Sequence, residues 1–259
     1  MQNSKSVYIE TYGCSANQSD SEMMAGLLKH RGFSLTKDIE SADLVIMNTC
    51  VVKTPTEQKE IHRIKEIQEK YPYKKLIIAG CMAQSQHELV KKIAPESSLI
   101  GTHAISKITE VADQTLNGLI VQEMGVEEEK IILPKFRKNP VVDIVQINDG
   151  CLSNCTFCLT KKARGDLRSY SPERILQQIK FSNVQGCKEF WLTSQDTFCY
   201  GFDRKTNLPD LLQLITTNIR GDYFVRVGMG NPLHLKKYYP DLIEAYESDH
   251  IYKFLHIPV

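Results

Sequence analysis

The sequence predicts an α/β fold in two regions, because short apolar runs alternate with helical segments along most of its 259 residues. Strands connected through helices in this way form parallel sheets that helices cover on both faces. One charged stretch without steady periodicity, residues 119–140, interrupts the alternation and ends at Pro140. We therefore expect a parallel-sheet domain over residues 1–118, a linker over 119–140, and a second series of βα units over 141–259.

In the first region each expected strand is followed by a helix. The second helix has the clearest start, with Thr54 as N-cap, Pro55 at the first helical position, and Glu57 three residues after the cap. Gly32 closes the first helix. The expected strands are 7–13, 43–49, 75–80 and 98–101, and the helices after them are 17–30, 54–70, 87–93 and one that ends near Asn117.

The second region repeats the pattern. Ser171 stands before Pro172 at the start of its first helix, which is the typical order of an N-cap and a proline at the first helical position. The expected strands are 141–148, 188–194, 223–229 and 251–259, and the expected helices are 172–184, 207–220 and 238–248.

Composition limits the partners and the compartment. The chain is 42% apolar and 24% charged, and its formal net charge is +1. Such a chain cannot bind nucleic acid as a polyelectrolyte, so any contact of that kind must come from a local patch. No segment reaches the roughly 18 apolar residues of a membrane span, and the N-terminus lacks an apolar signal region. We therefore expect a cytoplasmic protein without membrane contact.

Eight cysteines in a cytoplasmic protein favour metal binding or catalysis over disulfides, because that compartment keeps thiols reduced. Cys187 and Cys199 stand alone and are expected to be ordinary small side chains of the core or surface. Cys14, Cys50 and Cys81, the strand-end triplet, each directly follow an expected strand and precede a helix. Since the carboxyl ends of parallel strands meet at one edge of a sheet, these three side chains should converge.

Three thiolates without a neighbouring histidine or carboxylate suit an iron–sulfur cluster with an open iron better than a closed four-ligand zinc site. Gly13 and Gly80 directly precede two of these cysteines, and glycine would let the backbone turn sharply and approach a bulky group. The alternative interpretation is three structural cysteines that happen to stand at strand ends.

A second set, Cys151, Cys155 and Cys158, follows the first strand of the second region and is called the loop triplet. Zinc ribbons pair two Cys-x2-Cys knuckles and bacterial ferredoxins use four cysteines per cluster, so neither pattern matches well. Three ligands on a four-iron cluster leave one iron open for a small molecule. Phe157, just before the last cysteine, could shield that iron, stack on a planar ligand, or pack in an ordinary core.

The loop triplet resembles the cluster motif of radical S-adenosylmethionine (SAM) enzymes, and the whole chain resembles one branch of them, the methylthiotransferases. The similarity lies in YGCSANQSDSE (12–22), DLVIMNTCVV (43–52), IIAGCMAQ (77–84) and ARGDLRS (163–169). EFWLTSQDTFCYG (189–201) is similar to the archaeal and eukaryotic type. Those enzymes convert N6-threonylcarbamoyladenosine at tRNA position 37, beside the anticodon, to its 2-methylthio form.

This resemblance implies two [4Fe–4S] clusters and an incomplete radical SAM barrel over residues 141–259. The loop triplet would hold the cluster whose open iron binds SAM, and the strand-end triplet would hold an auxiliary cluster that delivers sulfur. These cofactors would carry the chemistry, so no side chain is assigned a catalytic role. Residues expected beside SAM are Phe157, Ser194, Gln195, Asp196 and Arg226; the alternatives are a loop cap for Asp196 and a packed or paired Arg226.

A basic run follows the loop triplet, with Asp166 as its one acidic residue: Lys161, Lys162, Arg164 and Arg168. Such a run is either a solvated surface or a contact for RNA phosphates. The resemblance implies the anticodon stem-loop of tRNA as the substrate, an electron donor such as ferredoxin or flavodoxin, and a monomer when the chain is complete.

The sequence is also compatible with other functions. Within the family, the substrate could be isopentenyladenosine in tRNA or an aspartate of a ribosomal protein; in a different class, the chain would be a non-catalytic iron–sulfur electron carrier or scaffold. Family members continue past HIPV (256–259) with two further βα units and a small RNA-binding barrel called TRAM. We therefore expect this length of chain to be poorly soluble, to bind tRNA weakly, and to turn over little of it.

Overall fold

The computed structural model describes residues 4–125 and 129–258, and the chain divides into two compact units. The first unit comprises Met1–Phe136 and Thr156–Arg164. The second comprises Arg137–Cys155 and Gly165–Val259. Cys151 and Cys155 belong to the second unit, and Cys158 belongs to the first.

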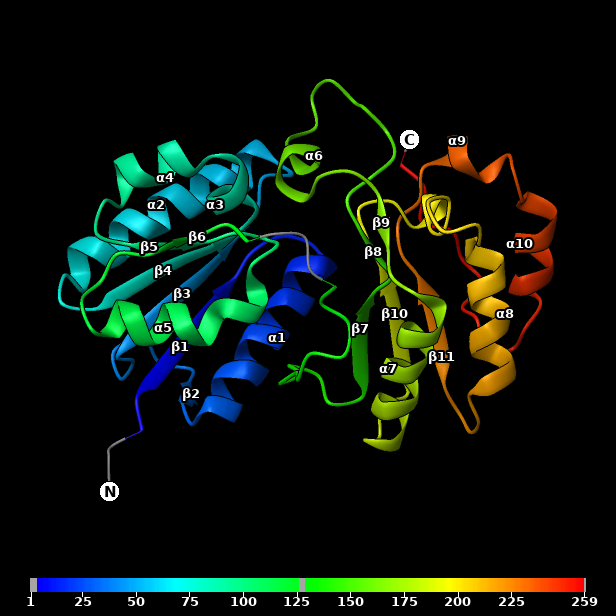
Figure 1. The fold of residues 1–259 in the computed structure, drawn as a ribbon, viewed down its shortest axis with the longest axis horizontal. Coiled ribbons are helices and arrows are strands. Elements are labelled where there is room, and N and C mark those ends of the chain that lie inside the picture. Colours follow the sequence, from blue (N-terminus) through cyan, green and yellow to red (C-terminus); the bar gives the residue numbers. More distant parts are fainter. Residues whose placement is uncertain (1–3, 126–128, 259) are drawn as a thin grey trace. The chain divides into compact units, whose positions relative to one another are not determined.

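A parallel sheet of six strands forms the centre of the first unit, which confirms the predicted fold class (Figure 1). Its strand order is β2-β1-β3-β4-β5-β6. The last strand lies inside the segment expected to be a linker and pairs with β5. The strands are β1 (Ser6–Thr11), β2 (Ser34–Thr36), β3 (Leu44–Thr49), β4 (Lys75–Gly80), β5 (Ser98–Ile100) and β6 (Gln122–Glu123).

Helices cover both faces of this sheet, as Figure 1 shows. Helices α1 (Ser15–Arg31) and α5 (Ile108–Leu116) lie on one face, with the 3-10 turn η1 (Ile105–Lys107) before α5. The other face carries α2 (Thr54–Lys70), α3 (Cys81–Ser85) and α4 (His87–Ile93), and α6 (Leu159–Arg164) packs against α3.

Alternate residues of the central strands enter different cores. In β3, Leu44 and Ile46 pack with residues of α1 and α5, whereas Val45 and Met47 pack with residues of α2 and α4. All residues of β3 are buried. Burial on both faces explains why this strand reads as a continuous apolar run rather than an alternating one. Each fully buried aliphatic side chain of this kind contributes about 1.5–3 kcal/mol.

The helix ends agree with the sequence at two places and differ at one. Gly32 caps α1 with a left-handed backbone of φ 104°, as predicted. The hydroxyl of Ser171 accepts a hydrogen bond from the Arg174 N–H at 3.2 Å, which confirms the predicted cap of α7. The predicted cap at Thr54 is wrong by one residue. Lys53 is the last residue with extended backbone, so Thr54 already lies inside α2.

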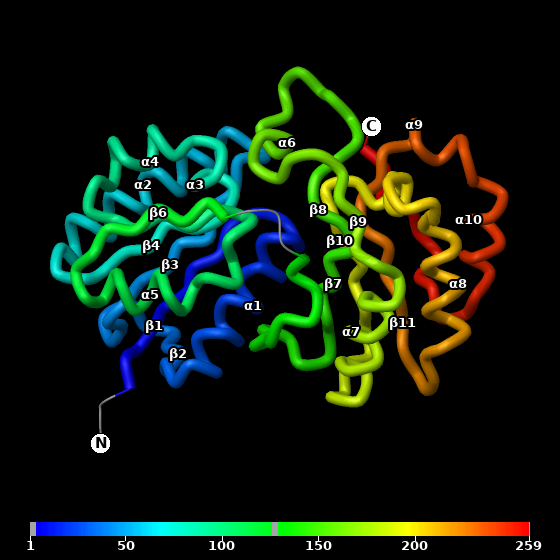
Figure 2. Tube along the Cα trace, viewed as in Figure 1, coloured from blue at the N-terminus to red at the C-terminus, as the bar shows by residue number. Residues whose placement is uncertain are grey.

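The second unit is built on three parallel strands in the order β11-β10-β7, and Figure 2 follows the chain from strand to helix through it. This is the predicted βα pattern. The strands are β7 (Val142–Gln146), β10 (Glu189–Thr193) and β11 (Phe224–Val227), and the helices after them are α7 (Pro172–Val184), α8 (Leu208–Asn218) and α10 (Tyr239–Tyr246). Smaller elements are β8 (Asn148–Asp149), β9 (Arg168–Ser169), η2 (Thr197–Cys199) and α9 (Pro232–Leu235).

The strand predicted over residues 251–259 is wrong for the part that the structure describes. Ile251 makes one isolated parallel bridge with Val225, and no ladder follows it through residue 258. The backbone stays beside β11 through single hydrogen bonds, such as Gly230 N–H to the His256 carbonyl at 3.1 Å. Residues 253–256 are exposed. An apolar pattern alone does not form a strand where no continuous ladder pairs its backbone groups.

Within the described residues, no helix combines the length and the apolar character that crossing a membrane requires.

Candidate metal centre

The strand-end triplet lies at the point where the order of the first sheet reverses. Cys14, Cys50 and Cys81 follow β1, β3 and β4, which are neighbours in the sheet. The chain passes from β1 to β2 on one side and then returns to β3 on the other. Ligands of open parallel sheets bind outside the carboxyl ends of the strands at such a switch point. The fold therefore brings the three cysteines to a position that suits a cofactor.

Contacts around these cysteines show that they lie close together. A Cβ built on Gly13, next to Cys14, would lie 2.7 Å from the Cys50 Sγ. The Cys81 Sγ lies 3.6 Å from the Asn17 Oδ1, one helical turn after Cys14. Among the described residues the three sulfur atoms do not form a group lying wholly within 4.8 Å. Zn–S bonds of about 2.3 Å would demand a tighter group, so the spacing suits a cluster of several metal ions better than one ion.

Both predicted glycines have the backbone that only glycine adopts easily. Gly13 has φ 95° and Gly80 has φ 88°. A Cβ on Gly80 would lie 2.2 Å from the Asn48 Oδ1 and 2.7 Å from the Thr49 carbonyl oxygen. The chain is thus pressed against its neighbours where it turns into Cys14 and Cys81. This confirms the predicted sharp turns, and the approach to a bulky group stays a prediction.

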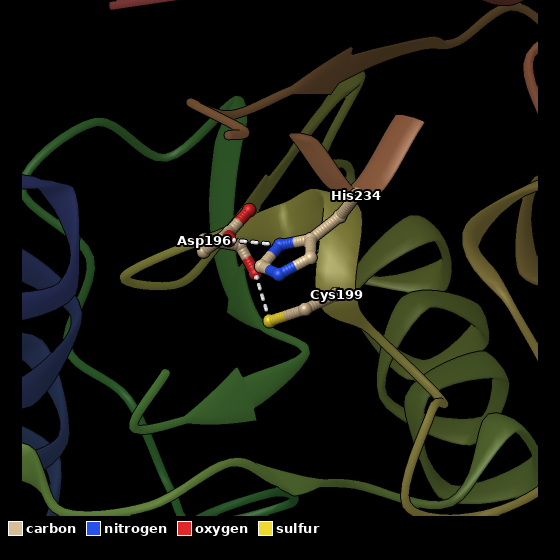
Figure 3. Close-up of side chains that lie close together, drawn as sticks. All are labelled: Asp196, Cys199 and His234. Atoms are coloured by element: carbon tan, nitrogen blue, oxygen red, sulfur yellow. Dashed lines mark hydrogen bonds and ion pairs between the residues drawn. The ribbon is translucent and has the colours of Figure 1, made fainter. Parts of the chain in front are cut away.

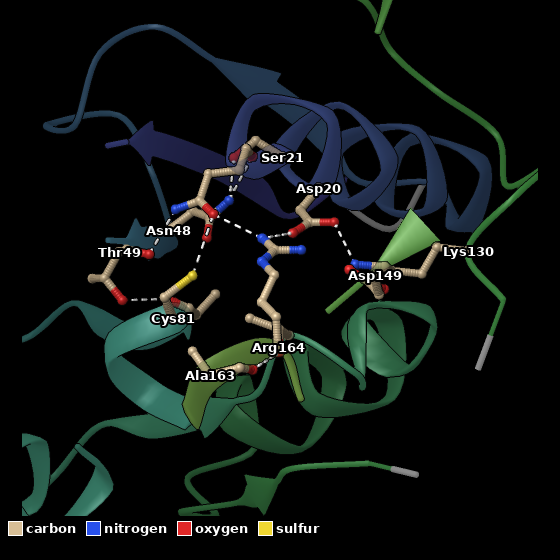
Figure 4. Close-up of polar contacts among 12 residues, drawn as sticks. Asp20, Ser21, Asn48, Thr49, Cys81, Lys130, Asp149, Ala163 and Arg164 are labelled. Carbon is tan, nitrogen blue, oxygen red and sulfur yellow. Dashed lines mark hydrogen bonds and ion pairs between the residues drawn. The ribbon is translucent and has the colours of Figure 1, made fainter. Parts of the chain in front are cut away.

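Two buried asparagines join the loops that carry the cysteines (Figure 4). The Asn17 side-chain amide donates to the Tyr12 carbonyl at 3.0 Å and to the Thr49 carbonyl at 2.7 Å. The Asn48 amide donates to the Asn17 carbonyl at 2.8 Å. Glu60 of α2 adds a clamp from the other face, because its carboxylate accepts the Cys50 N–H at 3.0 and 3.1 Å. These bonds fix the backbone on which the cysteines stand.

Arg164 of α6 lies inside this region, as Figure 4 shows. Its Nη2 donates to the Asp20 Oδ2 at 2.7 Å and to the Asn17 Oδ1 at 2.8 Å. Lys130 donates to the other Asp20 oxygen at 3.0 Å. The side chains of Arg164 and Asp20 are fully buried and that of Lys130 is 2% exposed. Two cations therefore surround one buried carboxylate beside Cys81.

The surroundings oppose ionisation of the buried thiols in the metal-free protein. Burial raises the pKa of Cys81 to about 12; the nearby Arg164 charge works against the rise, and Cys14 and Cys50 add to it. Burial likewise raises the pKa of Cys50. A metal that binds these thiols must therefore displace their protons. The soft all-thiolate donor set, the glycine turns and the spacing together fit the iron–sulfur cluster that the sequence suggests.

The loop triplet differs. Cys155 is exposed, and Cys151 and Cys158 are half-buried. The Cys151 Sγ accepts the Ser153 N–H at 3.3 Å. A hydrogen bond from the Cys199 thiol lowers the pKa of Cys151 well below its usual range and raises that of Cys199. Phe157 is 86% exposed, so it does not pack in a core.

Among the residues expected beside SAM, Phe157 lies in the loop before α6 and Arg226 lies within β11. The other three, Ser194, Gln195 and Asp196, directly follow β10. Asp196 caps η2 through the Phe198 N–H, as the capping alternative anticipated, and its other oxygen contacts His234. The Ser194 hydroxyl accepts the Asp196 N–H at 3.1 Å. The Gln195 Oε1 is buried without a hydrogen-bond partner among the described residues. Arg226 lies over the Trp191 and Phe254 rings, at 5.0 and 5.4 Å from their centroids.

The basic run does not form one surface. Lys162 is exposed and Lys161 is partly exposed. Arg168 lies 3.7 Å from the Asp149 Oδ2 and is 19% exposed. Arg164 is 1% exposed and is engaged with Asp20, which corrects the prediction that it contacts RNA phosphates. The reason is that Ala163 and Arg164 are the buried residues of α6, whereas Lys161 and Lys162 of the same short helix reach solvent.

Sequence reasoning missed Asn17, Asp20, Lys130 and His234. The first two lie in the motif directly after Cys14, where a buried polar face of α1 breaks the apolar periodicity expected of a covered helix. That break was the signal available. Lys130 is distant from Asp20 in sequence, and the spacing of His234 from the other histidines resembles no ligand motif.

Comparisons with known proteins agree with this geometry. The fold resembles a radical SAM methyltransferase, TsrM, from Kitasatospora setae, solved with tryptophan and a SAM analogue. The TM-score is 0.63 at 13% identity, over 98% of this chain and 59% of that one. Residues 6–101 match the model of the Uncharacterized protein family UPF0004. The chain therefore combines a region that matches UPF0004 with an α/β fold similar to that of this solved structure.

Two relatives are similar in sequence to 98% of the chain. The chain is 41% identical over 254 residues to a probable threonylcarbamoyladenosine tRNA methylthiotransferase of Methanothermobacter thermautotrophicus, covering 98% of this chain and 59% of that protein. It is 39% identical over 263 residues to the threonylcarbamoyladenosine tRNA methylthiotransferase of Homo sapiens, covering 98% and 44%. The chain is thus similar over 98% of its length to threonylcarbamoyladenosine tRNA methylthiotransferases, and it spans about half of the length of these relatives.

Proposed function

We propose that this chain provides the sulfur-delivering domain and the first part of the radical SAM region of an enzyme that methylthiolates N6-threonylcarbamoyladenosine at tRNA position 37. The observation that carries the proposal is the convergence of Cys14, Cys50 and Cys81 at the sheet's switch point, in a chain 41% identical to a relative of that name. Side chains of a parallel-sheet edge do not activate an aromatic C–H bond by acid–base chemistry, so cofactors must do so.

In this proposal the strand-end triplet holds an auxiliary [4Fe–4S] cluster, and the loop triplet holds a second one that binds SAM. When bound, the clusters would supply the reductive cleavage of SAM and the sulfur, and a second SAM molecule would supply the methyl group. An electron donor such as a ferredoxin or flavodoxin would provide the reducing equivalents.

The protein's own contribution at the first site is to hold and charge-balance the thiolates. Asn17 and Asn48 fix the turns after β1 and β3. Arg164 places a buried positive charge near Cys81, which offsets part of the negative charge that three thiolates bring. Because burial raises the pKa of the Cys50 and Cys81 thiols, cluster loading would release their protons.

At the second site, the buried Gln195 Oε1 is available to accept a hydrogen bond, and the amino group of SAM is a suitable donor. Ser194 orders the turn after β10 through Asp196. For the tRNA backbone, Lys161 and Lys162 are the residues of the basic run that reach solvent. A patch this small gives weak and strongly salt-dependent binding.

Mass spectrometry of tRNA nucleosides from a strain lacking the gene tests this function. We expect the 2-methylthio form of N6-threonylcarbamoyladenosine to disappear and the unmodified nucleoside to accumulate. The intact gene and a Cys187→Ala version should restore the product, whereas Cys81→Ala should not. Unchanged product in the deletion strain would refute the proposal, and loss of methylthio-isopentenyladenosine alone would assign the sister substrate.

A further inference from the structure

A third group of metal-ligating side chains lies in the second unit, apart from the strand-end triplet. Asp196, Cys199 and His234 each offer one ligand atom, and these atoms all lie within 4.8 Å of one another. Figure 3 shows the three side chains pointing toward one another from the turn after β10 and from α9. Asp196 is 2% and Cys199 0% exposed, and the His234 side chain is 14% exposed.

The carboxylate is held so that one oxygen faces this group. The Asp196 Oδ1 accepts the Phe198 N–H at 3.0 Å and the Asn231 N–H at 2.9 Å. The Oδ2 contacts the His234 Nδ1 at 2.7 Å. The Cys199 thiol donates to the Asp196 carbonyl at 3.2 Å, so its sulfur is fixed beside the same residue. Bonds from the backbone thus orient the ligand atoms before any metal arrives.

Cys151 offers a second sulfur, as a fourth ligand, close to this group. The Cys151 Sγ lies 4.0 Å from the Asp196 Oδ2. Two thiolates, one imidazole and one carboxylate are ligands of tetrahedral Zn²⁺, at bonds of roughly 2.0–2.3 Å. Affinity for such a mixed set rises from Fe²⁺ to Zn²⁺, so zinc would displace ferrous iron there.

We propose that Asp196, Cys199, His234 and Cys151 form a zinc site in the protein whose loop triplet carries no cluster. Binding of Zn²⁺ releases the thiol protons of Cys151 and Cys199. Four metal–ligand bonds replace the internal hydrogen bonds, and no oxidation state changes. Since Cys151 also belongs to the loop triplet, Zn²⁺ and the SAM-binding cluster compete for it. This last step rests on the proposed function, whereas the site itself does not.

Anaerobic titration of the metal-free chain with Co²⁺, a spectroscopic substitute for Zn²⁺, tests the site. Both triplets also bind Co²⁺, so the informative quantity is the difference between variants. We expect Cys199→Ser and His234→Gln to bind one equivalent less than the intact chain, with less thiolate-to-cobalt absorption. Cys187→Ser, which removes another buried cysteine of the same unit, should bind as the intact chain does. Equal stoichiometry in all four proteins would overturn the site and leave a metal-free hydrogen-bonded cluster.

Iron loading tests the competition. One equivalent of Zn²⁺ added before reconstitution should lower the iron content of the intact chain by about four per molecule and leave that of His234→Gln unchanged. Equal iron content with and without Zn²⁺ in the intact chain would remove Cys151 from the ligand set. Failure of the loop triplet to take up iron even without Zn²⁺ would instead count against the proposed function, while the Co²⁺ result would stand.

Discussion

The two cysteine triplets that we propose as metal sites differ in how the chain holds them. The strand-end triplet stands on three neighbouring strands. Cys50 and Cys81 are buried, Cys14 is exposed, and Asn17 and Asn48 join the turns between them. The loop triplet stands on an irregular segment, with Cys155 exposed. The first site is therefore formed by the sheet itself, and the second depends on a loop whose backbone has few such bonds.

This difference has an energetic consequence. The hydrogen bonds that hold the cysteines of the first site also stabilise the folded chain. Substitutions at this site should therefore lower the free energy of unfolding. Substitutions in the loop that carries the loop triplet should weaken metal binding and scarcely change the free energy of unfolding. The predictions below test that contrast, beginning with the largest expected effect.

Thiol alkylation should separate the triplets most strongly. In the metal-free protein at pH 8, we expect Cys155 to react with iodoacetamide at least about 100-fold faster than Cys81, because Cys81 is buried and its pKa is raised to about 12. The Cys81 rate should rise about tenfold per pH unit as pH increases toward that pKa, since only the thiolate reacts. Peptide mass spectrometry measures both sites in one sample. Similar rates would show that the first site is not enclosed.

Removing the buried cation beside Cys81 should destabilise the first unit. Arg164→Leu leaves the carboxylate of Asp20 with Lys130 as its remaining cation among the contacts described, and we expect a loss of about 3 kcal/mol in the free energy of unfolding. Lys162→Leu, on the exposed side of the same helix, should change it by less than about 0.5 kcal/mol. Urea unfolding measures both. Equal effects would mean that Arg164 acts as a surface residue after all.

Replacing a glycine in the turns before Cys14 and Cys81 should destabilise the folded chain. Gly80→Ala places a Cβ against the Asn48 Oδ1 and the Thr49 carbonyl at a backbone of φ 88°, and we expect a loss of about 3 kcal/mol. Gly186→Ala is the matched control, because it has φ 96° but no atom within 4 Å of the new Cβ, so its loss should be about 1 kcal/mol. A Gly80→Ala protein as stable as the control would show that the turn is not tightly packed.

Replacing Phe157 should change the free energy of unfolding least. Phe157→Ser removes a ring that is 86% exposed, so the free energy of unfolding should stay within about 0.5 kcal/mol of that of the intact chain. Thermal melting measures this. A drop of more than about 2 kcal/mol would place Phe157 in a core instead and would weaken its assignment as a residue beside SAM.

Much of the first region could be predicted, because strand ends in a parallel sheet are fixed by apolar runs and glycine turns. Cys14, Cys50 and Cys81 follow from that rule. The burial of Arg164 could not, since its partners Asp20 and Lys130 are far away in sequence and a basic run reads as surface. His234 and Cys199 meet only through the fold, and residues 251–258 show that an apolar pattern does not by itself supply a pairing partner.

Iron content after anaerobic reconstitution tests the central claim, that the strand-end triplet is a cluster site independent of the loop. We predict about eight irons per intact chain, and about four in a protein with Cys151, Cys155 and Cys158 all replaced by alanine. The converse protein, with Cys14, Cys50 and Cys81 replaced, should also keep about four. Loss of all iron on replacing the loop triplet, or none lost on replacing the strand-end triplet, would contradict the account.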